Sequence, residues 1–347
     1  MIESRHRKLA GVIPAPLTPF TEEGKVDWTL LEKQLAYLVT AGADGLFVSG
    51  TTGEGAFLTT AEKAEILRAA KKIVAGRAFI AAACIQPSTP QVLEELAVLG
   101  RLEPDYVVAV APYYYAVPQD AVREHFRAIA RRSPVPLILY NIPQCTHNSI
   151  ALDTVLELAR EKNVAGIKDS SGDFVTFCRG LLADVPERFS WIMGEDYLDG
   201  PAMLSGAHGI VTGLSNVWAG YHVGLVRAAQ AGDVAALTNL GRMYRRGYGV
   251  PVSNAKAYMW FNLAASRYPA SMQESREDAI RSRDRTANKM TSDRIAQAQK
   301  LARQNNDAGA ARRALVEGGL DAVKIQPLAS GLALSRTSFY WFFKDRR

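Results

Sequence analysis

Three short segments carry hydroxyl or amine groups of the kind used in covalent catalysis. Thr51 and Thr52 lie in the glycine-flanked stretch 50–54, Tyr140 opens the string Tyr-Asn-Ile-Pro, and Lys168 lies in Gly-Ile-Lys-Asp. Each segment follows an apolar run that is typical of a buried strand. If those runs are strands of one parallel barrel, their carboxyl ends lie on one face, where such barrels hold their active sites. We therefore expect these side chains to form one site.

The residue types favour imine chemistry. A lysine amine can attack a carbonyl carbon, and the apolar approach 164–167 would favour its neutral, nucleophilic form. Tyr140 can pass protons, while backbone N–H groups of the threonine turn can bind a carboxylate. Taken singly, each motif has a plain alternative, namely a surface lysine, a barrel-lining aromatic and a tight turn. Their combination predicts one catalytic set.

Together the motifs resemble the dihydrodipicolinate synthase and N-acetylneuraminate lyase family over about residues 11–232. The resemblance implies that Lys168 forms a Schiff base with pyruvate or a related 2-oxo acid and that Tyr140 relays protons. The sequence itself implies no metal or organic cofactor, because its histidines show no close ligand spacing. Matching substrate-binding positions are Thr51, Thr52, Gly53, Gly194 and Val211.

A further tyrosine concerns assembly. Tyr114, in the string Pro-Tyr-Tyr, matches a family tyrosine that completes the hydroxyl relay with Thr52 and Tyr140, often across a subunit interface. The resemblance thus implies a homo-oligomer, provided that the C-terminal region permits association.

One departure from the family concerns the second substrate. Two residues after Pro143, dihydrodipicolinate synthases present an arginine to that substrate's carboxylate, whereas this chain has Cys145. Cysteine lacks the paired donors of a guanidinium, so condensation of pyruvate with aspartate semialdehyde is disfavoured. We expect reversible aldol cleavage of a hydroxylated 2-oxo acid to pyruvate and an aldehyde. A 2-oxo-acid dehydratase that uses the same imine is the alternative.

An α/β fold must position these residues. Helical stretches such as 30–39 and 61–74 alternate with eight strand-like runs, at 12–17, 46–49, 79–84, 106–110, 137–140, 164–168, 190–193 and 209–212. Such alternation predicts parallel strands, and eight strands permit closure into a TIM (β/α)8 barrel over residues 1–232. An open doubly wound sheet would carry a glycine fingerprint after its first strand, and 14–19 has none.

Beyond residue 232 strand signals vanish, which predicts an all-α C-terminal region. Residues 233–305 resemble a Sel-type, tetratricopeptide-like helical repeat, with Leu240, Tyr244, Trp260 and Leu263 expected to pack between two helices. Residues 306–347 resemble a truncated TetR-type helix-turn-helix. Three unrelated resemblances in tandem suggest a chimera.

The alternative function is an inert barrel with a DNA-binding or scaffolding C-terminal region. The truncation of the helix-turn-helix segment argues against strong nucleic-acid binding, because specific recognition usually needs paired half-sites.

Composition narrows the remaining classes. The net charge of +6 is unevenly distributed. Up to Val234 the chain has 21 Lys+Arg and 26 Asp+Glu, whereas beyond Val234 it has 20 Lys+Arg and 9 Asp+Glu. A solvated helical face explains the basic C-terminal part. The five histidines show no ligand spacing, so we expect no metal. Three widely spaced cysteines and the lack of a long apolar run predict a cytoplasmic protein with reduced thiols and no membrane contact.

Overall fold

The computed structural model describes residues 8–230, 235–246, 252–268, 270–296 and 298–299. The chain divides into two compact units, Met1–Ala231 and Gly232–Arg347, which are considered separately.

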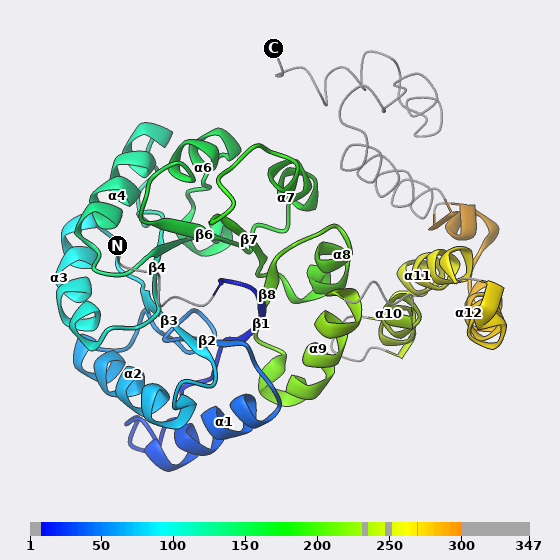
Figure 1. The fold of residues 1–347 in the computed structure, drawn as a ribbon, viewed down its shortest axis with the longest axis horizontal. Helices are drawn as coiled ribbons and strands as arrows, with labels where there is room; N and C mark the ends of the chain where they lie inside the picture. Colours follow the sequence, from blue (N-terminus) through cyan, green and yellow to red (C-terminus); the bar gives the residue numbers. More distant parts are fainter. Residues whose placement is uncertain (1–7, 231–234, 247–251, 269, 297, 300–347) are drawn as a thin grey trace. The chain divides into compact units, whose positions relative to one another are not determined.

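The first unit is a barrel of parallel strands (Figure 1). Its strands are β1 (Gly11–Pro14), β2 (Gly45–Val48), β3 (Phe79–Cys84), β4 (Tyr106–Val110), β5 (Leu137–Asn141), β6 (Val164–Asp169), β7 (Ser190–Met193) and β8 (Gly209–Thr212). Hydrogen bonding runs from β2 through β3 to β8 and then to β1, and β1 also contacts β2, so the barrel is nearly closed. The predicted (β/α)8 fold class is confirmed.

Helices surround these strands (Figure 1). They are α1 (Trp28–Thr40), α2 (Thr60–Val74), α3 (Thr89–Leu99), α4 (Gln119–Arg132), α5 (Pro143–Thr146), α6 (Leu152–Leu158), α7 (Phe174–Leu181), α8 (Asp199–Leu204) and α9 (Ser215–Gln230), with 3-10 turns η1 (Gly100–Leu102) and η2 (Asp196–Leu198). Thr59 starts α2 with a reciprocal capping box to Glu62. The first strand ends at Pro14, earlier than the predicted residue 17. Pro16 has no N–H to donate, and the N–H of Leu17 donates to the side chain of Asn216 instead of to a strand.

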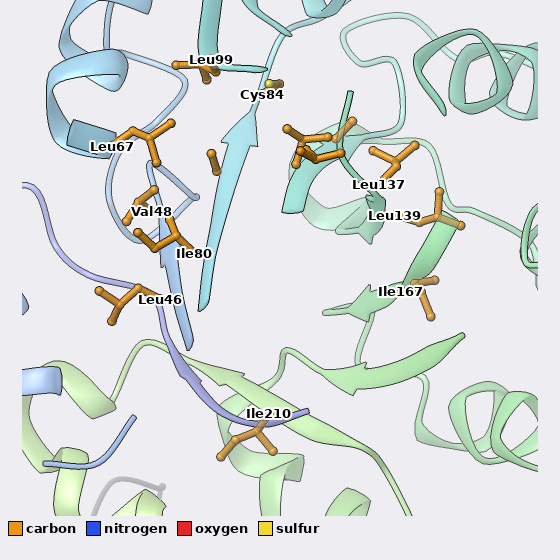
Figure 2. Packing of buried hydrophobic residues seen from close by; sticks show 14 of the residues in the cluster. Leu46, Val48, Leu67, Ile80, Cys84, Leu99, Leu137, Leu139, Ile167 and Ile210 are labelled. Atoms are coloured by element: carbon orange, nitrogen blue, oxygen red, sulfur yellow. The ribbon is translucent and has the colours of Figure 1, made fainter. Parts of the chain in front are cut away.

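Both faces of the strands are buried, which explains why they read as continuous apolar runs. Inward-facing side chains such as Phe47, Ile138 and Ile192 fill the barrel. The larger outer set packs against the helices, and Figure 2 shows part of it, including Leu46, Val48, Ile80, Leu139 and Ile167. The barrel is therefore a packed core whose chemistry must lie at its rim.

The second unit is helical where it is described. Its elements are α10 (Ala235–Arg246), α11 (Asn254–Arg267), η3 (Ala270–Met272) and α12 (Gln273–Ala287), and α11 packs against both α10 and α12. Tyr244, Trp260 and Leu263 are buried, as expected for a helix pair. The expected all-α region is thus confirmed, while its assignment to a Sel-type repeat stays a prediction. The repeat's glycine turn (247–251) and the helix-turn-helix expected at 306–347 lie outside the described residues.

Within the described residues, no helix combines the length and apolar character that a membrane span requires.

Candidate functional site

Lys168 lies inside the barrel near the carboxyl end of β6. Its side chain is 6% exposed, and its Nζ stands 3.8 Å from the ring centroid of Tyr140 and 4.5 Å from that of Phe47. No carboxylate in the described part of the chain forms an ion pair with this amine. Two aromatic faces therefore provide its immediate surroundings, and they attract its cationic form.

Tyr140 joins this amine to the threonine turn. It is paired with Lys168 in the β5–β6 register, so strand pairing alone places the two side chains side by side. Its phenol oxygen lies 3.2 Å from Thr51 Oγ1, and its ring meets Phe47 edge-on at a centroid distance of 5.7 Å. A threonine hydroxyl therefore contacts the tyrosine as expected, but it belongs to Thr51, whereas the relay expected from the resemblance used Thr52.

The turn that follows β2 is fixed by close backbone packing. Thr18 Oγ1 donates a 2.7 Å hydrogen bond to the carbonyl of Gly53, and Gly55 N–H donates to the carbonyl of Gly50. A side chain at Gly53 would meet the Pro16 carbonyl oxygen at 2.8 Å, so only glycine fits there. Thr52 is half-buried and limits the space at Gly213, after β8. The turn thus presents its threonines at the barrel rim.

Gly194 follows β7 and packs directly against Lys168. A Cβ at this position would lie 2.6 Å from Lys168 Cε, so any larger residue would displace that side chain. The Gly194 N–H donates to the carbonyl of Asp169, and Ser170 Oγ donates to the carbonyl of Gly194 at 2.9 Å. The ends of β6 and β7 are therefore tied together around Lys168.

Val211 is buried on β8 among the inward-facing residues. It lines a small apolar cavity together with Lys168, Ile138 and Ile192. Both positions expected from the sequence thus lie near Lys168. Gly194 packs against the Lys168 side chain, and Val211 lines the same cavity as Lys168.

Asp169 anchors the strand ends without pointing to chemistry of its own. Its Oδ1 accepts hydrogen bonds of 3.0 Å from Asn141 Nδ2 and from the backbone N–H of Ser171. Burial raises the pKa of Asp169 above its ordinary value, although these hydrogen bonds oppose the shift. Since its bonding is satisfied, a positional role explains this carboxyl.

An acidic segment between β7 and α8 was missed by sequence reasoning. Glu195 and Asp196 follow Gly194, and Asp199 begins α8. Asp196 Oδ1 accepts from the N–H of Gly213 at 3.1 Å, while both carboxyl oxygens of Asp199 are buried and without a hydrogen-bond partner. The signal that could have found them is the presence of three acids within five positions directly after a strand.

Tyr114 does not join the site within one chain. It is 79% exposed, adopts a positive φ of 81°, and its ring contacts Tyr115 edge-on at a centroid distance of 5.0 Å. No hydrogen bond connects it to Thr51, Thr52 or Tyr140 in the described structure.

Cys145 lies exposed on α5, which follows the Tyr140 strand. Its thiol is thus exposed just after the end of β5. Among the described residues, no group of three or more His, Cys, Asp or Glu side chains is arranged to hold a metal ion.

Comparisons with known proteins show which family this chain is similar to. A model of the dihydrodipicolinate synthetase family matches residues 8–243. The 4-hydroxy-tetrahydrodipicolinate synthase of Microcystis aeruginosa is 38% identical over 65% of this chain and 75% of its own length. The 4-hydroxy-tetrahydrodipicolinate synthase of Moorella thermoacetica is also 38% identical, over 67% of this chain and 79% of its own length.

Among solved structures, a dihydrodipicolinate synthase from Acinetobacter baumannii complexed with pyruvate is similar, with a TM-score of 0.66 and 25% identity over 81% of this chain and 99% of that chain. Fold and sequence thus point to the same relatives. The chain belongs to the dihydrodipicolinate synthetase family and is a carbon–carbon lyase of the class I aldolase type.

Proposed function

We propose that this protein is a pyruvate-dependent aldolase in which Lys168 forms the imine. The observation that carries the proposal is the position of the Lys168 amine, buried at a strand end and 3.8 Å from the Tyr140 ring centroid. The neutral amine attacks the C2 carbonyl carbon of the 2-oxo acid, water leaves, and an iminium remains. Loss of a proton from C3 gives an enamine, whose carbon then attacks an aldehyde; aldol cleavage is the reverse.

Proton transfer in these steps is assigned to the Thr51–Tyr140 pair. Water can leave only when the carbinolamine oxygen is protonated, and the amine must first lose its own proton. The Tyr140 phenol lies beside Lys168 in register, and its 3.2 Å contact with Thr51 Oγ1 gives it a partner toward the barrel rim. A phenol can serve as both donor and acceptor in such a relay.

The carboxylate of the 2-oxo acid is assigned to the turn at Thr51, Thr52 and Gly53. Its backbone N–H groups and threonine hydroxyls are donors, and the packing of Gly53 against Pro16 fixes their position. Gly194 and Val211 complete the pocket next to Lys168, where absence of a side chain at Gly194 leaves room for the amine.

Borohydride trapping tests the proposal. Incubation with pyruvate and borohydride should give a reduced pyruvyl adduct on the peptide that contains Lys168, measured by mass spectrometry. The Lys168→Arg variant should give no adduct, whereas Lys162→Arg, an exposed lysine six positions earlier, should react like the parent. An adduct elsewhere, or none from folded protein, would contradict the proposal.

The second substrate separates two candidates. With Cys145 in place of a carboxylate-binding arginine, we propose an aldehyde without a carboxylate at that end, and hence a hydroxylated 2-oxo acid as the cleavage substrate. The second candidate is 4-hydroxy-tetrahydrodipicolinate synthase, the name of the Microcystis aeruginosa and Moorella thermoacetica relatives. Product analysis with pyruvate and aspartate semialdehyde distinguishes the two.

For assembly, we propose a homo-oligomer in which the exposed Tyr114 of one copy completes the site of another. We retain the proposed division into 1–232, a Sel-type segment 233–305 and a helix-turn-helix 306–347. Binding of DNA by the last segment is the weaker candidate function. A salt-dependent gel shift at nanomolar protein would support it, and the lack of a shift at micromolar protein would exclude it.

A further inference from the structure

Asn148 is a buried residue for which the catalytic scheme above has no use. It lies between α5 and α6 and is 6% exposed. Its Nδ2 donates 2.8 Å hydrogen bonds to the carbonyls of Pro112 and Tyr115, and its Oδ1 accepts from the N–H of Val117 at 3.0 Å. Both hydrogens and the oxygen of this side-chain amide are therefore engaged by one stretch of chain, residues 112–117, which we call the tyrosine segment.

Few other contacts hold the exposed part of the tyrosine segment. The segment follows β4 and leads into α4, and its remaining hydrogen bond within the described residues runs from the Tyr113 N–H to the Pro87 carbonyl at 3.3 Å. The Tyr113 ring packs against the inward-facing core. Tyr114 and Tyr115 are instead 79% and 75% exposed, so packing does little to fix them. The Asn148 amide is thus the main restraint on these two residues.

The backbone of Tyr114 needs such a restraint. Its φ is 81°, in the left-handed region that residues with a side chain rarely adopt. A conformation of this kind costs energy and persists where surrounding contacts enforce it. The carbonyls of Pro112 and Tyr115, which precede and follow Tyr114 in the chain, both accept from Asn148. One amide group, the Asn148 clamp, therefore fixes both ends of the strained turn.

The clamp is itself attached to the ends of two barrel strands. Two residues after it, the N–H of Ile150 donates to Asn141 Oδ1 at 3.0 Å, and Asn141 Nδ2 donates to Asp169 Oδ1, also at 3.0 Å. Asn141 and Asp169 are the last residues of β5 and β6, the strands that carry Tyr140 and Lys168. Hydrogen bonds and a short stretch of chain thus join the tyrosine segment to the strand ends of the candidate site.

We propose that Asn148 is a positioning residue that presents Tyr114 to the active site of a neighbouring copy. This inference rests on the proposed imine function of Lys168 and on the proposed role of Tyr114 across subunits. Asn148 transfers no proton itself. It holds the exposed phenol in one conformation before the copies meet, so less conformational freedom is lost when the proton relay assembles. On an unrestrained segment, the same phenol would reach its place only part of the time.

A double-variant cycle on the full-length protein tests the proposal. The rate of imine formation at saturating pyruvate is measured by borohydride trapping and mass spectrometry. Asn148→Ala and Tyr114→Phe should each lower this rate about 10- to 100-fold. The combined variant should be no slower than Tyr114→Phe alone, because Asn148 acts through that phenol. The pyruvate concentration that gives half the maximal rate should change less than about twofold.

Asn163→Ala is the matched control for a purely structural role. Asn163 Nδ2 also holds a connection, since it donates to the carbonyls of Ala130 and Ser133 at 2.9 and 3.0 Å, but it lies just before β6, at the opposite end of the barrel. Asn163→Ala should lower Tm as Asn148→Ala does and leave the imine rate unchanged. A parental imine rate in Asn148→Ala, or losses that multiply in the combined variant, would overturn the proposal.

Asn148→Asp is a second variant that keeps the shape of the side chain. An ionised carboxylate can still accept from Val117 but cannot donate to Pro112 or Tyr115, whereas a protonated carboxyl can donate to one of those carbonyls. The imine rate of this variant, divided by that of the parent at the same pH, should therefore rise as the pH falls. A ratio near one at every pH would show that the two donated hydrogen bonds do not matter for the reaction and would overturn the proposal.

Hydrogen exchange separates this inference from the proposed function. Backbone amides of the tyrosine segment should exchange faster in Asn148→Ala than in the parent, and unchanged exchange would overturn the clamp whatever the kinetics. A parent protein that forms no adduct would refute the imine function, and a parental rate in Tyr114→Phe would refute the role of Tyr114. If both single variants are slow and their losses multiply, the proposed function stands and only the role of Asn148 falls.

Discussion

The hydroxyl of Thr51 lies 3.2 Å from the phenol oxygen of Tyr140, although the two residues are 89 positions apart in the sequence. Strand topology brings them together, because the turn after β2 and the end of β5 lie at the same rim of a parallel barrel. The ring of Phe47, which precedes that turn, packs against Tyr140 and keeps its orientation. The relay therefore depends on the fold as much as on the residue types.

Removal of the Tyr140 phenol should slow imine formation. In Tyr140→Phe the ring still packs on Phe47, so Tm should change little, while the rate of imine formation falls about 10²–10⁴-fold through loss of proton transfer. Thr51→Val should cost only about fivefold to tenfold, the value of one hydrogen bond. Thr51→Ser keeps the hydroxyl and is the control. Borohydride-trapping rates at fixed pyruvate give these values; equal losses in the Tyr140 and Thr51 variants would contradict separate roles.

Sequence patterns predicted most of the barrel. Runs such as 79–84 and 106–110 coincide with β3 and β4 because strands buried on both faces are continuously apolar. The first strand was predicted too long. Its apolar run, 12–17, contains prolines and does not show where hydrogen bonding to the neighbouring strand ends. In the C-terminal unit the helices were predicted from composition. Their assignment to a Sel-type repeat depended on sequence motifs, and no contact of α10 or α11 tests that assignment.

The candidate site was predicted in part. Lys168, Tyr140 and Thr51 lie together as expected, because each ends a strand or follows one directly. Phe47 and Asp199 were not found. A phenylalanine within an apolar run gives no sign that its ring will face an amine, and the burial of an acid at a helix start depends on packing that only the tertiary structure specifies.

An arginine at position 145 should change the second substrate. Cys145 is exposed at the start of the β5–α6 connection, so Cys145→Arg should be tolerated and should supply paired donors to a carboxylate. We expect kcat/KM for condensation of pyruvate with aspartate semialdehyde to rise about 10- to 100-fold, corresponding to one charge-assisted hydrogen bond. Cys145→Lys tests charge without the planar fork, and Cys145→Ser tests loss of the thiol. No gain with arginine would reject this explanation of specificity.

Tyr114 should act on a neighbouring copy if it acts at all. It is 79% exposed and joins no hydrogen bond to the site in its own chain. Tyr114→Phe alone should lower kcat about 10- to 100-fold. When Tyr114→Phe is mixed with Lys168→Arg and subunits exchange, activity should return, because a mixed pair holds one complete site. Tyr115→Phe, the exposed neighbouring ring, is the control; failure of the mixture to regain activity would refute action across subunits.

His125 should make the barrel sensitive to acid. Its Nε2 lies 3.0 Å from the Val110 carbonyl oxygen and its Nδ1 lies 2.8 Å from Thr89 Oγ1, and burial lowers its pKa to about 4. An unfolded histidine titrates near 6.5, so below that pH the unfolded chain binds a proton that the folded chain does not. This contribution is complete above about pH 6.5 and disappears toward pH 4, by about 3 kcal/mol in total.

His125→Gln tests this dependence, since its amide can replace both hydrogen bonds without titrating. Urea unfolding of the variant should lose less stability between about pH 6.5 and about pH 4 than the parent. The exposed His147→Gln variant should follow the parent curve. Parallel curves for the His125 variant and the parent would show that this histidine does not govern acid stability.

The buried ion pair between Lys63 of α2 and Glu95 of α3 should contribute to the stability of the barrel. Both side chains are 1% exposed, their contact is 2.7 Å, and the second Glu95 oxygen has no partner within the described residues. Lys63→Met strands a buried carboxylate and should lower the free energy of unfolding by about 3–5 kcal/mol. Adding Glu95→Leu removes the stranded charge and should restore most of that loss. Arg68→Met breaks the exposed pair with Glu65 and should cost less than about 1 kcal/mol. If the double variant were no more stable than Lys63→Met, loss of packing rather than loss of charge balance would account for the effect.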